Sequence, residues 1–168
     1  MQEQDRIQIV GYEDRLAADF ARLNRDWLEG FDLLEPADEK YLAAPREAII
    51  EAGGDIFFAV DDGTVIGTCA VLPSGPTDVE LAKLAVAPEA QRRGIGRRLT
   101  QVAIDYARNA GAQKMVLVSN SKLVSAIRLY ESLGFKHAPV PVNTGYVSAD
   151  VYMELSLAAS ESAPESSN

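Results

Sequence analysis

Cysteine and histidine are nearly absent from this sequence, which contains one residue of each. A single cysteine excludes an intramolecular disulfide framework and a cysteine-based metal cluster, and a single histidine excludes a multi-histidine metal site. Cys69 lies in the apolar run TVIGTCAVL, which favours a small buried core residue over a catalytic thiol. His137 follows a predicted helix end and is not favoured as a catalytic base. We therefore expect no metal site.

Long apolar runs and a targeting leader are also missing. No stretch approaches the ~20 apolar residues that span a bilayer, and the start, MQEQDRIQIV, has neither a basic leader nor an apolar segment. A length of 168 residues suits one domain with a full core. We predict a single cytoplasmic domain over residues 1–157, away from membranes, and a disordered tail over residues 158–168, where AASESAPESSN lacks large apolar side chains.

Positive charge is scarce, because 16 basic residues stand against 25 acidic ones and the formal net charge is −9. This balance disfavours nonspecific binding to nucleic acid or to anionic membranes. Against the overall sign, four arginines fall within seven positions, at 92, 93, 97 and 98. No second basic patch or interleaved aromatic accompanies them, so a nucleic-acid-binding domain is not favoured. The cluster either flanks a solvated helix start or holds a strongly negative group.

Hydrophobic periodicity predicts the element order β, α, α, three β, α, β, α, β, β. Strands are expected at 6–12, 55–60, 64–72, 79–86, 114–118, within 135–142 and at 149–155. Helices are expected at 13–31, as one or two pieces within 37–53, at 95–111 and at 122–133. Asp62-Gly63 between two apolar runs predicts a hairpin. The fold class is therefore α/β, a mixed and mostly antiparallel sheet with helices on both faces.

The stretch LAVAPEAQRRGIGRRL, residues 84–99, links a predicted strand to a predicted helix that begins near Gly94. The first turn of a helix has unpaired N–H groups and a partial positive charge, and Gly94 and Gly96 let a ligand approach the backbone. Arginines at this end oppose the helix dipole, so the cluster calls for an anion. The pattern fits neither a Walker loop nor a Rossmann fingerprint. We predict a diphosphate site of another kind.

These residues resemble the acyl-CoA signature of the GNAT acetyltransferases, [Q/R]-x-x-G-x-[G/A] after a strand, which Gln91, Gly94 and Gly96 meet. Downstream, SNSKLVSAIRLYESLGFK is similar to that family's second cofactor motif, an asparagine after a strand, a helix with alanine and tyrosine, and then Leu-Gly-Phe. The resemblance extends from the first strand to about Leu155. It implies the acyl-CoA N-acyltransferase fold and acetyl-CoA as the cosubstrate, with coenzyme A as product.

The resemblance also implies a cofactor site in three parts. The strand before the signature would bind the pantetheine arm, the signature loop would bind the diphosphate, and the second motif would contact the reactive end of the cofactor. The implied cofactor-binding residues are Leu84, Ala85, Val86, Gln91, Arg92, Arg93, Gly94, Ile95, Gly96, Arg97, Asn120, Ala126 and Tyr130.

Acetyl transfer to an amine requires a group that removes a proton from the amine and a group that protonates the departing thiolate. The resemblance places Tyr130 near the sulfur as the acid, although its apolar stripe with Ile127 alone favours a core aromatic. It also favours Glu80 as the base, acting through a water, and the alternative is a solvent-facing strand residue. Lys83 could pair with Glu80 only across a bulge, because strand alternation otherwise separates them.

In this family the acceptor pocket is built from the first two helices, the loop between them and the last strands. Those segments contribute carboxylates and aromatics, which suit a cationic amine. We predict substrate contacts at Trp27, Glu35, Tyr146 and Asp150.

The expected function is acetyl transfer from acetyl-CoA to a primary amine of a small molecule, by direct attack in a ternary complex. The alternatives are a protein N-terminal or lysine acetyltransferase and a non-catalytic acyl-CoA sensor. A homodimer is compatible with the sequence.

Overall fold

Seven strands form one sheet in the order β1-β2-β3-β4-β5-β7-β6 in the structure, a computed structural model that describes residues 6–158. The strands are β1 (Ile7–Gly11), β2 (Asp55–Asp61), β3 (Thr64–Ser74), β4 (Asp78–Val86), β5 (Lys114–Ser119), β6 (Lys136–His137) and β7 (Val151–Ser156). The helices are α1 (Ala17–Gly30), α2 (Pro36–Ala43), α3 (Ile95–Asn109) and α4 (Val124–Ser132). Short helical turns are η2 (Asp14–Leu16), η3 (Arg46–Ile50) and η4 (Pro88–Ala90).

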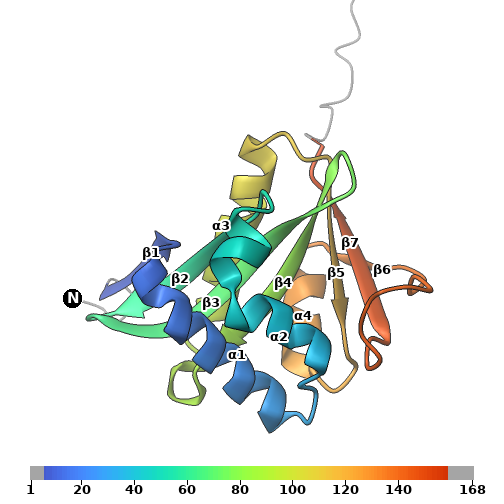
Figure 1. Cartoon of the computed structure of the whole chain (residues 1–168). Coiled ribbons are helices and arrows are strands. Elements are labelled where there is room, and N and C mark those ends of the chain that lie inside the picture. The colour runs from blue at the N-terminus through green and yellow to red at the C-terminus, as the bar shows by residue number, and fades with distance from the viewer. Residues whose placement is uncertain (1–5, 159–168) are drawn as a thin grey trace, which may run out of the picture.

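Helices cover both faces of this sheet, with α1 and α2 in front and α3 and α4 behind (Figure 1). On the front, α1 buries Phe20 and Leu23 against β3 and β4. On the back, α3 buries Ile95 and Leu99. These residues lie on two of the helices that the periodicity predicts, and the predicted fold class is confirmed.

The contact between α3 and β3 is close because β3 has a glycine there. A Cβ on Gly67 would lie 2.9 Å from Cγ2 of Ile95 and 3.0 Å from Cδ1 of Leu99. The Sγ of the fully buried Cys69 lies 3.6 Å from the carbonyl oxygen of Leu99. Burial raises the pKa of this thiol well above its ordinary value. Cys69 is therefore a core residue, as predicted.

The sheet is antiparallel except between β4 and β5, and this parallel pairing is short. It covers Asp78–Glu80 of β4 and Lys114–Val116 of β5. Beyond Glu80, β4 pairs only with β3, and there the register shifts so that Lys83 and Leu84 stand opposite one residue, Cys69. Lys83 has a φ of 57°, which marks a β-bulge. The two central strands therefore separate, and the sheet is open between them.

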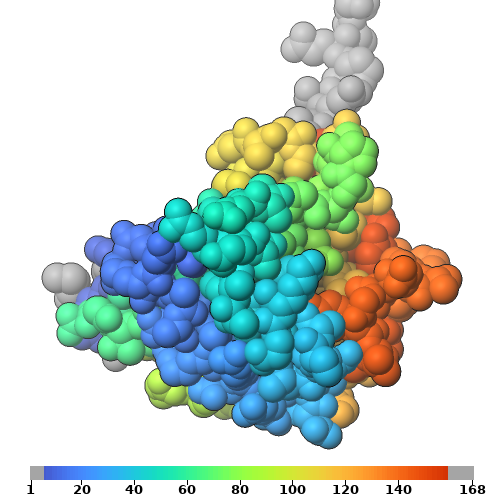
Figure 2. Space-filling view, in the orientation of Figure 1, coloured from blue at the N-terminus to red at the C-terminus, as the bar shows by residue number. Residues whose placement is uncertain are grey.

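The C-terminal part differs from expectation in the length of β6, which comprises only Lys136–His137. Pro139 and Pro141 follow, and proline has no N–H for a strand ladder. Residues 138–150 instead form a long loop that reaches α2, seen in Figure 2 as orange atoms against cyan ones. The predicted tail lies outside the described residues beyond Ala158, and the single domain stays a prediction.

No helix within residues 6–158 is long and apolar enough to cross a membrane. In the same part of the chain, no group of three or more His, Cys, Asp or Glu residues is arranged to hold a metal ion.

Candidate active site

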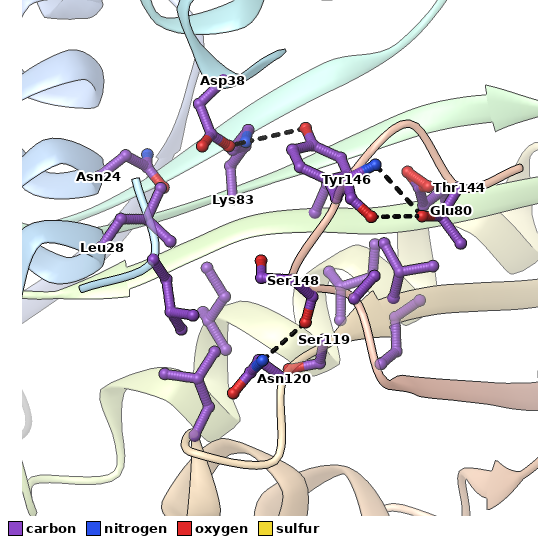
Figure 3. A pocket seen from close by; sticks show the side chains of 18 of the residues that line it. Asn24, Leu28, Asp38, Glu80, Lys83, Ser119, Asn120, Thr144, Tyr146 and Ser148 are labelled. Carbon is purple, nitrogen blue, oxygen red and sulfur yellow. Dashed lines mark hydrogen bonds and ion pairs between the residues drawn. The ribbon is translucent and has the colours of Figure 1, made fainter. Parts of the chain in front are cut away.

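A cavity of about 190 Å³ lies where β4 and β5 separate. Its walls are contributed by α1, α2, β4, β5, α4 and the 138–150 loop (Figure 3). The predicted site residues that line it are Trp27, Glu80, Leu84, Asn120, Tyr130 and Tyr146. The opening of the sheet thus brings together residues from distant parts of the sequence.

Glu80 is the last residue of β4 that pairs with β5, and it lines this cavity. It is half-buried. Loss of hydration raises the pKa of its carboxyl group, and the nearby Lys83 ammonium opposes that rise. Glu80 is therefore a cavity residue with a stronger affinity for protons than an exposed glutamate has.

Tyr130 reaches the cavity from α4 and is 7% exposed. Its ring packs against Phe135 with 5.7 Å between ring centres. Its hydroxyl makes no hydrogen bond within residues 6–158. Every solvent-inaccessible polar side-chain atom in that part of the chain has a partner, so the Tyr130 hydroxyl must be accessible, and it faces the cavity. Burial raises the pKa of this phenol, which stays protonated. The ring belongs to the core and the hydroxyl to the site.

Lys83 carries a buried positive charge into the wall of the cavity. The bulge turns its side chain to the same cavity as Glu80, and the side chain is 7% exposed. Its ammonium pairs with the carboxylate of Asp38, which is 3% exposed, and donates to the hydroxyl of Tyr146 at 3.1 Å. It also lies 5.5 and 5.0 Å from the ring centres of Tyr41 and Tyr146. These contacts compensate for the desolvation of the charge.

A continuous polar network, which we call the Asp38 network, links Glu35, Asp38, Lys83, Tyr146 and Ser148. The second oxygen of Asp38 accepts the N–H of Glu35 at 2.8 Å. The Glu35 carboxylate accepts the N–H groups of Val147 and Ser148 at 2.8 and 3.0 Å, and also the hydroxyl of Ser148. Burial opposes the charge of Glu35, but these hydrogen bonds outweigh it and lower its pKa. The network ties α2, the β4 bulge and the 138–150 loop together.

Two of the predicted substrate contacts hold the loop and do not line the cavity. Glu35 belongs to the Asp38 network, and the exposed Asp150 accepts the N–H and the hydroxyl of Ser121, both at 2.8 Å. Asn120 lines the cavity but also donates to the carbonyl of Ser148 at 2.6 Å. Trp27 and Tyr146 do face the cavity. The N–H groups of Val147 and Ser148 therefore bind one carboxylate that was predicted to contact substrate, and Ser121 binds the other.

The start of α3 is uncapped, which leaves several backbone donors available. Gly94 has a φ of 76°, no side chain caps the helix and no acidic residue lies in its first turn. The first N–H with a helical partner is that of Arg98, which donates to Gly94 at 3.1 Å, and the N–H groups of residues 95–97 donate to nothing within residues 6–158. A Cβ on Gly94 would meet nothing within 4 Å. This positive, open helix end fits a diphosphate.

The four arginines near this helix end do not all face it. Arg93 pairs with Asp61 of β2 at 3.1 Å, and Arg98 donates to the carbonyl of Ile7 in β1 at 3.0 Å. Arg97 donates to the hydroxyl of Ser132 at 2.6 Å, and the exposed Arg92 has no side-chain hydrogen bond or ion pair within residues 6–158. The expectation that all four arginines face one anion is therefore too broad, because Arg93 contacts β2 and Arg98 contacts β1.

The remaining predicted cofactor residues lie on β4, on α3 and α4, and on the connection that precedes α3. Ala85 is buried in β4, while Val86 and Gln91 line a second groove beside α1. Ala126 is half-buried in α4. A Cβ on Gly96 would lie 3.3 Å from Cδ2 of Leu129, so Gly96 also allows α3 and α4 to approach closely.

The sequence does not predict Asn24 as a site residue. It indicates Asp38 only as one of the carboxylates of the acceptor segments and Lys83 only as a possible partner of Glu80, although all three line the cavity. A signal existed for Asp38, because Glu35 and Asp38 have capping-box spacing around the proline that starts α2. No local pattern reveals the bulge at Lys83.

A sheet that opens between β4 and β5, with an uncapped helix start beside the opening, is typical of the acyl-CoA N-acyltransferase fold. The chain belongs to the acetyltransferase (GNAT) family, whose model matches residues 19–135. The resemblance stated from the two motifs is thus confirmed.

Individual relatives agree with this assignment. The chain is 35% identical over 133 residues to an uncharacterised N-acetyltransferase of Schizosaccharomyces pombe, a match that covers 73% of this chain and 82% of that protein. It is 32% identical over 100 residues to N-acetyltransferase family 8 member 2 of Rattus norvegicus, covering 56% of this chain but only 44% of the relative. The yncA structure from Salmonella typhimurium, solved with its cofactor acetyl-CoA, has a TM-score of 0.75 and 25% identity, and the match covers 96% of this chain and 99% of that one.

Asp38→Asn is expected to destabilise the protein strongly, because it leaves the Lys83 ammonium buried without its counter-charge. Breaking a buried pair costs about 3–5 kcal/mol, which thermal or urea unfolding measures directly. The asparagine can still accept the N–H of Glu35, so the loss reports the charge. The double variant Asp38→Asn/Lys83→Met is expected to recover most of the stability.

Glu39→Gln is the matched control, because its partner Arg25 and Glu39 itself are 38% and 48% exposed. This variant is expected to melt close to the wild type. Equal melting temperatures for Asp38→Asn and the wild type would contradict the assigned role of the buried pair.

Proposed function

We propose that this chain transfers the acetyl group of acetyl-CoA to a primary amine of a small molecule, by direct attack in a ternary complex. The observation that carries the proposal is that one cavity, at the opening of the sheet, contains both Glu80 and Tyr130. Burial makes Glu80 a better proton acceptor and keeps Tyr130 a protonated donor. Amine acetylation needs this combination of base and acid.

The chain has suitable groups for the cofactor in the expected places. The free N–H groups of residues 95–97, with the side chains of Arg92 and Arg97, would hold the diphosphate. The edge of β4 at Leu84–Val86, which no longer pairs with β5, would hold the pantetheine arm. Acetyl-CoA supplies an activated acetyl group as a thioester. The protein therefore has to bind, orient and manage protons.

Two side chains of the cavity, one on β4 and one on α4, handle the protons of the reaction. Glu80 on β4 accepts the proton that the amine loses as it attacks, directly or through one water. Tyr130 on α4 holds a proton at its Oη, where it can be donated to the leaving sulfur. A bound amine is thereby converted to an amide without a net change in the charge of the protein.

The size and closure of the cavity favour a small acceptor. About 190 Å³ is available, and the 138–150 loop is held over it by the Asp38 network. A protein N-terminus or lysine would enter more easily if this loop were displaced. A sensing role would use the same cofactor groups but would not require Glu80 or Tyr130. A homodimer and a cytoplasmic location also remain proposals.

The direct test is acetyl-CoA-dependent release of free thiol across a panel of small amines, amino acids, polyamines and short peptides, with a blank that lacks acceptor. Release with small amines supports the proposal, and release with peptides alone would replace it with protein acetylation. Absence of release with a retained acetyl-CoA-induced rise in melting temperature would favour a sensor.

Activity is expected to rise with pH through an inflection above the range of an exposed glutamate. Burial raises the pKa of Glu80, so its ionised, proton-accepting form appears only at higher pH. Glu80→Gln should lose this inflection and lower kcat by roughly 10²–10⁴-fold. The wild type and Glu80→Gln are compared with the same amine, so that the titration of the amine itself contributes equally to both pH profiles.

Glu29→Gln, at an exposed position of α1 that does not line the cavity, provides the control for this profile. It should keep the wild-type pH dependence. A Glu80→Gln enzyme with wild-type kcat at every pH would remove Glu80 from the mechanism.

Gly94→Asp is expected to weaken acetyl-CoA binding at least tenfold, about 1.4 kcal/mol, because a carboxylate would stand where the diphosphate binds. Gly94→Asn is the matched control, since both residues face the same backbone cost at a φ of 76° and have nearly the same size. Calorimetric titration should show a much smaller loss for asparagine. Equal affinities for the two variants would show that the negative charge meets no phosphate.

A further inference from the structure

Asn24 of α1 has an amide oxygen without a hydrogen-bond partner among residues 6–158. Its Nδ2 donates to the carbonyl of Phe20, one turn earlier, at 2.9 Å, and this bond fixes the orientation of the amide. Asn24 is 1% exposed and lines the cavity. Its Oδ1 accepts no hydrogen bond within residues 6–158. Every solvent-inaccessible polar side-chain atom in that part of the chain has a partner, so this oxygen must be accessible to solvent. The small exposed part of Asn24 is therefore this oxygen, facing the cavity.

A buried carbonyl oxygen is unfavourable without a hydrogen-bond donor. The other amide group of the cavity, that of Asn120, has partners for both of its polar atoms, since Nδ2 donates to Ser148 and Oδ1 accepts the N–H of Lys122. Asn24 thus differs from Asn120 in offering an acceptor that the fold does not use. Its natural partner is a donor that enters with a ligand.

The position of Asn24 separates this acceptor from the reacting centre. Figure 3 shows Asn24 on the α1 side of the cavity and Glu80 on the other side, with Lys83 and Tyr146 between them. A small amine that reacts near Glu80 would therefore direct its far end towards Asn24.

The charges around the cavity specify what that far end can be. The charged side chains that line it are those of Asp38, Glu80 and Lys83, and Asp38 and Lys83 neutralise each other as a direct pair. Glu80 lies on the side away from Asn24 (Figure 3), so a second ammonium next to Asn24 would gain no free counter-charge. A carboxylate would bring its lone pairs against the oxygen of Asn24. A neutral group with a polar hydrogen meets neither penalty.

We propose that Asn24 determines acceptor specificity by accepting a hydrogen bond from a neutral hydroxyl or amide N–H at the far end of the acceptor. The acceptor is then a short amino alcohol or amino amide whose amine reacts at Glu80. This inference rests on the proposed acetyltransferase function and names its substrate class.

The test compares kcat/KM, from thiol release, for alkylamines, ω-amino alcohols and diamines of matched chain length. At the best length the amino alcohol should exceed the alkylamine by roughly threefold to tenfold, the value of one neutral hydrogen bond. Asn24→Leu should abolish this ratio, because the hydroxyl then loses its acceptor while the alkylamine loses no hydrogen bond. Asn24→Asp should move the preference to the diamine, because a carboxylate then faces its second ammonium.

An unchanged ratio in Asn24→Leu, or no preference at any length in the wild type, overturns the proposal and indicates that a water satisfies the oxygen. The rise in melting temperature with acetyl-CoA verifies that each variant keeps its fold and cofactor site. Should no amine release thiol, the proposed function fails. The same three acceptors are then titrated calorimetrically into wild type and Asn24→Leu, where a binding preference lost in the variant supports the site and its absence overturns it.

Discussion

The buried ammonium of Lys83 is the charge on which the shape of the active site depends. An unpaired ammonium in the protein interior would cost several kcal/mol, and the left-handed backbone at Lys83 adds a further cost. The fold meets these costs by bringing Asp38, Tyr41 and Tyr146 around the charge. Because the three come from α2 and from the 138–150 loop, solvating one side chain also fixes the walls of the acceptor cavity.

The same bulge explains why the two functional regions meet. In a regular strand, β4 could have stayed paired with β5 along its length, and the backbone beyond Glu80 would have been satisfied by the sheet. Pairing ends at Glu80 instead, so a strand edge, a carboxylate and the phenol of Tyr130 all face one opening. One short stretch of β4 therefore contains the unpaired strand edge, the cavity carboxylate and the buried cation.

Sequence reasoning succeeded where the physics is local. Apolar spacing identified the helix faces that bury Phe20 and Leu99, and the Gly94 pattern identified a helix start that the structure leaves uncapped. It was less successful where partners are distant in the chain. The sequence predicts Glu35 and Asp150 as substrate contacts because their partners are distant in the chain. The N–H group of Val147, 112 residues away, binds Glu35. The N–H group of Ser121, 29 residues away, binds Asp150. The bulge at Lys83 depends on pairing between strands and has no local signature.

This difference follows from how the two halves of the site are made. The half of the site proposed for the cofactor consists mainly of backbone, namely N–H groups at the start of α3 and an unpaired strand edge, so glycine spacing alone can indicate it. The acceptor half consists of side chains held by one another, and its chemistry depends on which of them are already satisfied. Glu35 and Asn120 have hydrogen-bond partners within residues 6–158, whereas the oxygen of Asn24 has none there. Residue type therefore identifies the reaction class, while acceptor choice depends on the hydrogen bonds that the fold leaves unmade.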